Sequence, residues 1–249
     1  MNLKDKVCLV TGGTRGIGSA TAVALAEAGA HVAVIGRTED EESAATIHKL
    51  KSIGKPFASL CADCAQLTDI QRCVRETLAK LGPVDVFVHS AGGPVPGGLF
   101  EIDSAAWHAA FEIHVHAIFH FCREIIPMMQ KKKEGAVVLI SSTAGIRGVP
   151  INLAYQVVKG ALPQFTRALA REFANDNIRV NCVAPGVIRT RFHASMTEQQ
   201  RKLNLEHRIP LHREGTSEQV ASLILELIRN DYITGETMTI DGGLTMRIA

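Results

Sequence analysis

The chain has 249 residues, of which 46% are hydrophobic and 21% are charged. This balance is usual for a globular protein, and the length is enough for one α/β domain with a large core. The net charge of +2 gives no reason to expect a nucleic-acid partner, and the basic run at residues 131–133 is interpreted as a solvated helix end.

The N-terminal region and the cysteines indicate a compartment. The first apolar run, residues 7–10, is too short for a signal peptide or a membrane span. The six cysteines are scattered through apolar segments, which is typical of buried free thiols in a reducing environment. We therefore expect a cytoplasmic protein that does not bind a membrane.

Short β-rich runs alternate with longer stretches of helical spacing. The predicted strands are residues 7–11, 31–35, 56–60, 84–89, 136–141, 178–183 and 237–240. The predicted helices are residues 18–28, 40–53, 68–81, 104–129, 154–174 and 217–229. Apolar strands that alternate with helices indicate a parallel sheet covered on both faces. Since no linker or repeat divides residues 1–249, we predict a single Rossmann-type, doubly wound α/β domain.

A glycine-rich turn at residues 11–18 separates the first predicted strand from the first helix. Its glycines permit a tight turn and close approach of a pyrophosphate, and the helix N-terminus supplies free N–H groups. The spacing G-x-x-x-G-x-G differs from the common G-x-G-x-x-G fingerprint. A plain turn with small packing residues is the alternative, but the position after the first strand favours a dinucleotide site.

The end of the second predicted strand bears on the choice of cofactor. An acidic residue near this point holds the ribose 2′-hydroxyl in NAD binders, whereas Gly36, Arg37 and Thr38 stand here. A guanidinium can pair with a 2′-phosphate through two hydrogen bonds, and Arg15 in the glycine turn adds a second cation. Two cations without an acid predict NADP(H), with an ordinary exposed Arg37 as the alternative.

Tyr155 and Lys159 are four residues apart at the start of a predicted helix and so share one face. The reference pKa of tyrosine is about 10, and a nearby ammonium together with a cationic nicotinamide is expected to lower that pKa. Ser142 follows a predicted strand, from which its hydroxyl could bond the substrate oxygen. We predict that these three residues are catalytic and that Tyr155 exchanges the proton.

With these motifs, nearly the whole chain resembles the short-chain dehydrogenase/reductase family. Further matching segments are Ser90-Ala91-Gly92 for the N-A-G segment, Asn181…Pro185-Gly186…Thr190 for the nicotinamide-binding stretch, Asp241-Gly242-Gly243 for the C-terminal signature, and Asp63 for the adenine-contacting aspartate. The resemblance implies a seven-stranded sheet, NADP(H) chemistry on a small-molecule carbonyl or alcohol, and a homotetramer. The predicted cofactor-contacting residues are Gly12, Thr14, Arg15, Ile17, Gly18, Arg37, Thr38, Asp63, Cys64, Ser90, Ala91, Gly92, Tyr155, Lys159, Pro185, Gly186, Val187 and Thr190.

Two positions depart from the family pattern near the catalytic residues. The family's fourth catalytic residue is an asparagine seven residues after a tryptophan, and His114 stands seven residues after Trp107. The resemblance implies that this position holds a water that links the lysine to solvent. We hypothesise that His114 takes over this relay and titrates near neutral pH, or that it only packs in a shifted helix. His89 and Ser90 replace the asparagine pair before Ala91.

Pro163 lies one turn after Lys159 in the predicted catalytic helix. A proline there removes the hydrogen bond to the Lys159 carbonyl. A kink of the helix and a water on that carbonyl remain alternatives.

Two patterns resemble metal sites. Cys61 and Cys64 have C-x-x-C spacing without a second pair, and Glu112, His116 and His120 lie four apart on one helix face. The first pattern coincides with the adenine region, and the second lies on a helix that packs between subunits in the family. We therefore expect no metal.

The long irregular stretch at residues 186–215 follows a strand end, where ligands bind in such sheets, and residues 187–215 are predicted to form a substrate lid. Ser142, Arg147, Phe192 and His193 are the predicted substrate contacts. Together with Arg191, this charged lid favours a small polar carbonyl compound, such as a sugar-derived keto acid or uronate. A 3-oxoacyl thioester of acyl-carrier protein is the alternative, and a non-catalytic NADP(H) sensor is a third hypothesis that the intact catalytic residues disfavour.

Overall fold

A computed structural model describes residues 1–194 and 196–246. Seven parallel strands form one sheet in the order β3-β2-β1-β4-β5-β6-β7, which confirms the predicted doubly wound α/β fold. The strands are β1 Val7–Thr11, β2 His31–Gly36, β3 Phe57–Cys61, β4 Val86–His89, β5 Gly135–Ile140, β6 Ile178–Pro185 and β7 Thr237–Ile240. Each agrees with its predicted run to within two residues at either end.

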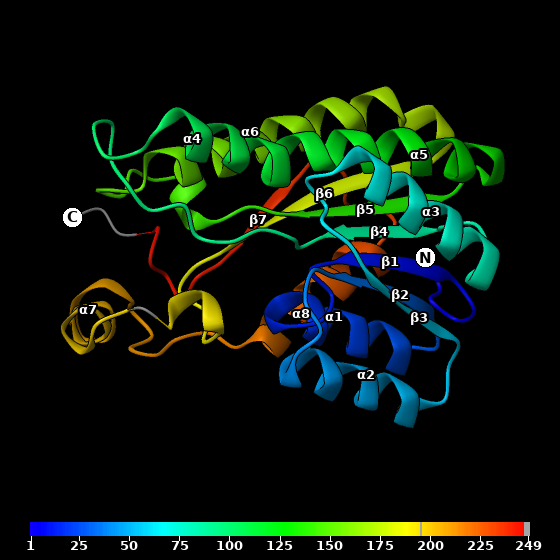
Figure 1. Cartoon of the computed structure of the whole chain (residues 1–249), viewed down its shortest axis with the longest axis horizontal. Coiled ribbons are helices and arrows are strands. Elements are labelled where there is room, and N and C mark those ends of the chain that lie inside the picture. Colours follow the sequence, from blue (N-terminus) through cyan, green and yellow to red (C-terminus); the bar gives the residue numbers. More distant parts are fainter. Residues whose placement is uncertain (195, 247–249) are drawn as a thin grey trace.

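Helices cover both faces of the sheet, as predicted (Figure 1). Helices α3 Leu67–Leu81, α4 Ser104–Phe111, α5 Ala117–Lys132 and α6 Leu153–Glu172 lie on one face, and α1 Gly16–Glu27, α2 Glu41–Ile53 and α8 Ser217–Arg229 lie on the other. The shorter elements are η1 Glu112–His116, η2 Thr143–Gly145, η3 Ala174–Asp176, η4 Arg191–His193, α7 Glu198–Leu203 and η5 Asn204–Arg208.

The continuous apolar strands are explained by two separate cores. In β1, Leu9 belongs to the core beneath α3, α5 and α6, while its neighbour Val10 belongs to the core beneath α1, α2 and α8. Successive side chains of a strand point to opposite faces, so a sheet with helices on both sides needs apolar residues at every position.

Two segments differ from the predicted elements. The predicted helix at residues 104–129 is interrupted by the π-helical turn η1, which holds His114. The stretch predicted to be irregular after β6 instead contains η4, α7 and η5. In that stretch, Thr197 caps α7 by accepting a hydrogen bond from the Gln200 N–H.

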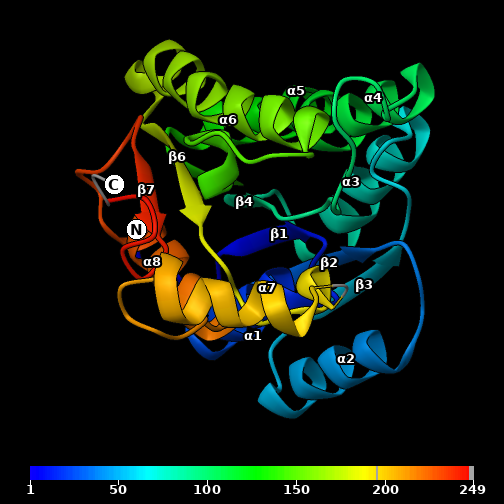
Figure 2. The same ribbon diagram turned by 90° about the vertical axis from the view of Figure 1, so that its left-hand side faces the viewer.

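The strand order places a binding crevice at a defined edge of the sheet. The chain reverses its winding direction between β1 and β4, and ligands bind in such sheets outside the carboxyl ends of the strands at this point. Helix α7 lies beyond the carboxyl ends of the strands (Figures 1 and 2). None of the helices in residues 1–194 and 196–246 is long and apolar enough to cross a membrane.

Candidate active site

A cleft of about 2250 Å³ runs along the carboxyl ends of the strands. It is lined by all the predicted catalytic residues and by every predicted cofactor-contacting residue except Gly18. Of the predicted substrate contacts, Ser142, Arg147 and Phe192 line the cleft, whereas the His193 side chain lies outside the part of the chain that the structure describes. The sequence therefore located the cleft.

The glycine turn fits a close backbone approach. Gly12 has a φ of +62°, and a Cβ atom there would lie 2.8 Å from the carbonyl oxygen of Ser90. A Cβ atom at Gly18 would lie 2.2 Å from the carbonyl oxygen of Gly12, so Gly18 serves the folding of the turn and not the cleft wall. Arg15 precedes α1 without capping it through its side chain. The turn therefore offers the helix N-terminus and small residues that a pyrophosphate needs.

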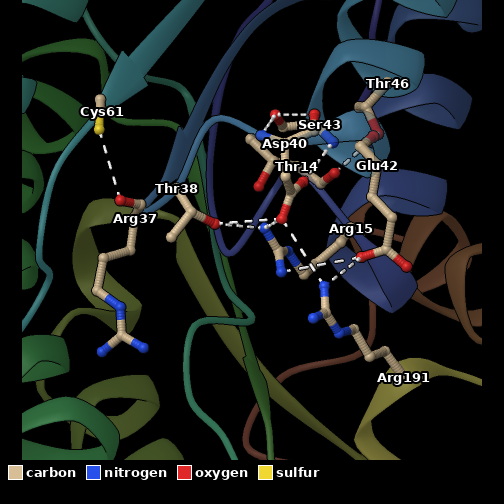
Figure 3. Close-up of polar contacts among 10 residues, drawn as sticks. All are labelled: Thr14, Arg15, Arg37, Thr38, Asp40, Glu42, Ser43, Thr46, Cys61 and Arg191. Atoms are coloured by element: carbon tan, nitrogen blue, oxygen red, sulfur yellow. Dashed lines mark hydrogen bonds and ion pairs between the residues drawn. The ribbon is translucent and has the colours of Figure 1, made fainter. Parts of the chain in front are cut away.

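The prediction of two cations without an acid near the end of β2 is wrong. Arg15 Nη2 lies 2.7 Å from Asp40 Oδ2, and Arg15 Nη1 lies 3.8 Å from Glu42 Oε2. Both carboxylates line the cleft, while Figure 3 shows that the Arg37 guanidinium points away from this pair. Sequence reasoning missed Asp40 because it stands four residues beyond β2, although its position as the residue before α2 was a readable capping signal.

Ser142, Tyr155 and Lys159 come together in the cleft from two elements. Tyr155 and Lys159 lie on one face of α6, and Ser142 follows β5 and precedes η2. Burial raises the pKa of Tyr155 to about 12, although a hydrogen bond with Ser142 lowers it in part. Burial lowers the pKa of Lys159 to about 8. These three side chains provide a phenol that keeps its proton at neutral pH, with a hydroxyl and an ammonium nearby.

The Lys159 ammonium is bound to the backbone at the end of β5, beside the Tyr155 ring. Its Nζ atom donates a 2.7 Å hydrogen bond to the carbonyl oxygen of Ile140 and lies 5.7 Å from the centre of the Tyr155 ring. Burial is the main cause of the raised pKa of Tyr155, and the hydrogen bond with Ser142 is the contact that lowers it. The predicted lowering by Lys159 together with a cationic nicotinamide stays a prediction.

Pro163 is accommodated without breaking α6, which continues from Leu153 to Glu172. The Lys159 carbonyl, which would have bonded a residue-163 N–H, accepts a 2.7 Å hydrogen bond from the buried Ser141 hydroxyl. A Cβ atom at Gly145 would lie 2.7 Å from the same carbonyl oxygen, so η2 packs closely on this turn. Ser141 therefore fixes the turn of α6 that carries Lys159 to the end of β5.

We expect Ser141→Ala to destabilise the protein by about 1–3 kcal/mol, because it leaves the buried Lys159 carbonyl without a partner. Pro163→Ala restores an N–H that can bond this carbonyl. In the double variant, the loss caused by Ser141→Ala is therefore expected to shrink by about 1 kcal/mol. Urea unfolding of the four proteins measures this coupling, and strictly additive losses would contradict it.

His89 and His114, the two histidines that depart from the family pattern, are both buried. His89 Nδ1 lies 3.0 Å from Thr11 Oγ1, and its Nε2 lies 3.1 Å from the carbonyl oxygen of Ile113. Burial and, to a smaller extent, the Lys159 charge lower the pKa of His89 to about 3 and that of His114 to about 2. The expectation that His114 titrates near neutral pH is therefore wrong, because its ring stays uncharged there.

His114 is held in one orientation by η1 and by Gly92. Its Nε2 lies 3.1 Å from the carbonyl oxygen of Gly93, so this nitrogen carries the proton of the neutral ring. A Cβ atom at Gly92 would lie 2.1 Å from the His114 ring, which explains a glycine at this position. The buried Nδ1 has no hydrogen-bond partner within residues 1–194 and 196–246, and the ring lies edge-on to Tyr155 at 5.8 Å.

The two metal-like patterns have other contacts. Cys61 is exposed and donates to the Arg37 carbonyl, whereas burial raises the pKa of Cys64 to about 12. His116 Nδ1 lies 3.1 Å from Glu112 Oε1. Within the described ranges, no three histidine, cysteine, aspartate or glutamate side chains lie close enough together to hold a metal ion.

Two predicted substrate contacts, Phe192 and Arg147, line the cleft from segments that are distant in the sequence. The Phe192 ring packs on Tyr155 with 5.5 Å between ring centres. The Arg147 guanidinium donates a 2.8 Å hydrogen bond to the carbonyl oxygen of Thr245, near the end of the described chain. The segment 187–215 thus contacts Tyr155 through Phe192, and the C-terminal segment contacts Arg147.

Comparison with known proteins identifies related sequences over almost the whole chain. The family described as enoyl-(acyl carrier protein) reductase matches residues 12–245. A 3-oxoacyl-[acyl-carrier-protein] reductase from Chlamydia muridarum is 34% identical over 244 residues, which are 97% of this chain and 98% of the relative. Glucose 1-dehydrogenase from Gluconobacter oxydans is 37% identical over 246 residues, which are 97% of this chain and 92% of the relative.

Solved structures agree with these sequence relatives. L-Sorbose reductase from Gluconobacter frateurii, complexed with NADPH and L-sorbose, matches with a TM-score of 0.92 and 26% identity and covers 100% of both chains. A short-chain type dehydrogenase/reductase from Mycobacterium ulcerans matches with a TM-score of 0.92 and 29% identity, over 99% of this chain and 92% of that one.

Proposed function

Because the chain belongs to the short-chain dehydrogenase/reductase family, as its motifs predicted, we propose that it is an NADP(H)-dependent oxidoreductase. Its proposed reaction is the reduction of a small polar carbonyl compound, or the oxidation of the matching secondary alcohol. The observation that carries this proposal is the convergence of Ser142, Tyr155 and Lys159 in the cleft that begins at the glycine turn. The cleft residues fit a dinucleotide, since Gly12 and Gly16, both with positive φ, leave the turn before α1 free of side chains where it lines the cleft.

The reduced nicotinamide supplies the hydride to the carbonyl carbon when it is bound, and the chain must supply a proton to the oxygen. Tyr155 keeps its proton at neutral pH because burial raises its pKa to about 12, so the proton is available for transfer. Its release to the substrate oxygen depends on neighbouring groups that stabilise the phenolate. The Ser142 hydroxyl is placed to bond the same oxygen as negative charge develops. With a pKa of about 8, Lys159 is mostly charged at pH 7 and stabilises the phenolate that remains.

His114 is proposed to assist this proton step as an uncharged ring. Its Nε2 proton is directed to Gly93, which leaves Nδ1 as a hydrogen-bond acceptor on a ring that lies edge-on to Tyr155. A buried, uncharged nitrogen of this kind can accept a hydrogen bond from a water or a hydroxyl group without becoming protonated. The position can therefore contribute to a relay of hydrogen bonds, but not through titration near neutral pH.

The substrate class is proposed from the charged residues that line the cleft. The segment 187–215 is proposed to act as the lid, and Arg147 and Arg208 add positive charge to the lining of the cleft. Positive charge attracts hydroxyl-rich or carboxylate-bearing compounds. The structural similarity to L-sorbose reductase supports this substrate class.

Reduction of a 3-oxoacyl thioester is the second candidate, and the similarity to several 3-oxoacyl-[acyl-carrier-protein] reductases favours it. The proposed homotetramer and cytoplasmic location stay predictions that follow from the family resemblance and the composition.

NADPH oxidation with a panel of ketoses, sugar-derived keto acids and a 3-oxoacyl thioester tests the proposal. We expect the highest kcat/KM with a polar ketone. A higher value with the thioester would support the second candidate instead. Binding of NADPH without turnover of any panel member would favour the non-catalytic sensor.

A further inference from the structure

Four charged side chains from three separate segments meet at one end of the cleft (Figure 3). Arg15 belongs to the glycine turn, Asp40 and Glu42 lie at the start of α2, and Arg191 begins η4 of the lid. Arg191 Nη1 lies 3.7 Å from Asp40 Oδ2 and 3.7 Å from Glu42 Oε2. A lid residue thus reaches across the cleft to the segment that follows β2.

The start of the lid also contacts the glycine turn itself. A Cβ atom at Gly16 would lie 3.5 Å from Thr190 Cγ2. Thr190 directly precedes Arg191, so the lid's first turn lies over the N-terminus of α1. This is the end of the cleft where Thr38, which accepts a hydrogen bond from Arg15, marks the predicted ribose position.

The carboxylates and the first arginine are held in place by other contacts. Asp40 accepts a hydrogen bond from the Ser43 N–H and so caps α2. Arg15 is bound to this same carboxylate at 2.7 Å and to Thr38 at 2.6 Å. The Asp40 carboxylate is therefore part of the helix cap, and Arg15 is already paired with this carboxylate.

Arg191 is held less firmly than Arg15. Its side chain is 65% exposed, and its contacts with Asp40 and Glu42 are longer than hydrogen bonds. Exposed ion pairs of this kind contribute little and are easily exchanged for better partners. A phosphate is such a partner, since a guanidinium can donate two parallel hydrogen bonds to it.

A 2′-phosphate at this end of the cleft would lie near two carboxylates, which repel it. Arg15 is already paired with Asp40, and Figure 3 shows the Arg37 guanidinium directed away from that pair. A further cation is needed to offset the carboxylates, and Arg191 is the one that the lid brings to them.

We propose that Arg191 binds the 2′-phosphate of NADP(H) and thereby couples the position of the lid to the identity of the cofactor. This inference rests on the proposed NADP(H) dependence. It assigns Arg191 to cofactor recognition, in place of the substrate attraction expected from the sequence. A cofactor without the phosphate leaves Arg191 on its long contacts to Asp40 and Glu42, and holds the lid less tightly.

Equilibrium binding of NADPH and NADH to the wild type, Arg191→Gln and Arg191→Lys tests the assignment. We expect Arg191→Gln to raise the Kd for NADPH about tenfold and to leave the Kd for NADH within about twofold. Arg191→Lys is expected to recover part of the loss. Equal losses for both cofactors, or a raised substrate KM with an unchanged Kd for NADPH, would overturn the assignment.

Arg201→Gln is the matched control, because it removes the same charge from the same lid. Arg201 pairs with Glu214, which keeps Arg189 as a second partner. Both Kd values of this variant are expected to match those of the wild type. A loss as large as that of Arg191→Gln would show a general effect of lid charge and overturn the assignment.

The lid coupling has its own readout. Adenosine 2′,5′-bisphosphate is expected to protect the segment 187–215 from proteolysis better than adenosine 5′-monophosphate does, and Arg191→Gln should abolish the difference. Equal protection of the wild type by both nucleotides would overturn the coupling.

The outcomes also separate this inference from the proposed function. A wild type that binds NADH as tightly as NADPH contradicts the proposed cofactor preference, and a selective effect of Arg191→Gln would still support the phosphate contact. A wild type that prefers NADPH with equal losses in Arg191→Gln retains the proposed function and refutes the contact.

Discussion

The Tyr155→Phe variant is expected to lose about 10²–10⁴-fold in kcat while it still binds NADPH. The substitution removes only the hydroxyl that donates the proton, and the ring can keep its packing against Phe192 and His114. Steady-state kinetics with the best carbonyl substrate of the panel and cofactor binding by fluorescence measure the two effects separately.

Tyr232 provides a matched control, since it is the second of the two tyrosines and is 97% exposed. Tyr232→Phe should retain the kcat and the NADPH affinity of the wild type. Full activity of Tyr155→Phe would contradict the proposed mechanism. A loss of NADPH binding in that variant would instead show that the phenol acts through the cofactor site.

Acid is expected to destabilise the protein through its two buried histidines. The pKa of His89 is lowered to about 3 and that of His114 to about 2, whereas the unfolded chain protonates histidine near pH 6.5. Since the folded pKa values are depressed, the stabilisation is present above pH 6.5 and is lost as the pH falls below it. Two protons bound only by the unfolded chain reduce the free energy of unfolding by about 3 kcal/mol per pH unit between about pH 6 and pH 4.

The His114→Asn variant isolates one of these protons. Urea unfolding at several pH values should give a slope that is smaller by about 1.4 kcal/mol per pH unit than that of the wild type. Carboxylates contribute equally to the pH slope of the unfolding free energy in both proteins. The difference between the two slopes therefore reports on His114. Identical slopes would show that His114 is protonated to the same extent in the folded and unfolded states.

The same position tests the proposed relay. His114→Ala removes the Nδ1 acceptor and should lower kcat without changing the Kd for NADPH, whereas His114→Asn retains an acceptor and should recover part of the rate. An unchanged kcat in both variants would reduce His114 to a packing residue.

Much of the architecture was predictable because it depends on local pattern. All seven strands and the five helices other than the one predicted at residues 104–129 were placed from apolar periodicity and turn residues. That helix was misjudged because the π-helical turn Glu112–His116 inserts without a proline or glycine signal. The helices of the lid were missed because α7 has only six residues and no buried side chain to produce a pattern.

The candidate site was predictable where its residues follow a strand or share a helical face. Ser142, Tyr155 and Lys159 meet this condition, and the cleft contains all three. The ionisation of the residues in the candidate site was less predictable. The pKa of Tyr155 and of His114 depends on burial, which arises from the packing of segments far apart in the chain.

The sequence by itself determined the doubly wound fold, the family and the position of the proposed catalytic residues, because these follow from periodicity and from spacing along one chain segment. Only the tertiary structure decided that Ser141 satisfies the carbonyl released by Pro163, and that Asp40, Glu42 and Arg191 join Arg15 at the cofactor end of the cleft. Each of these contacts joins residues at least eighteen positions apart, or segments separated by whole strands and helices. Short-range spacing carries no information about such contacts, because the path of the chain between the partners sets their distance.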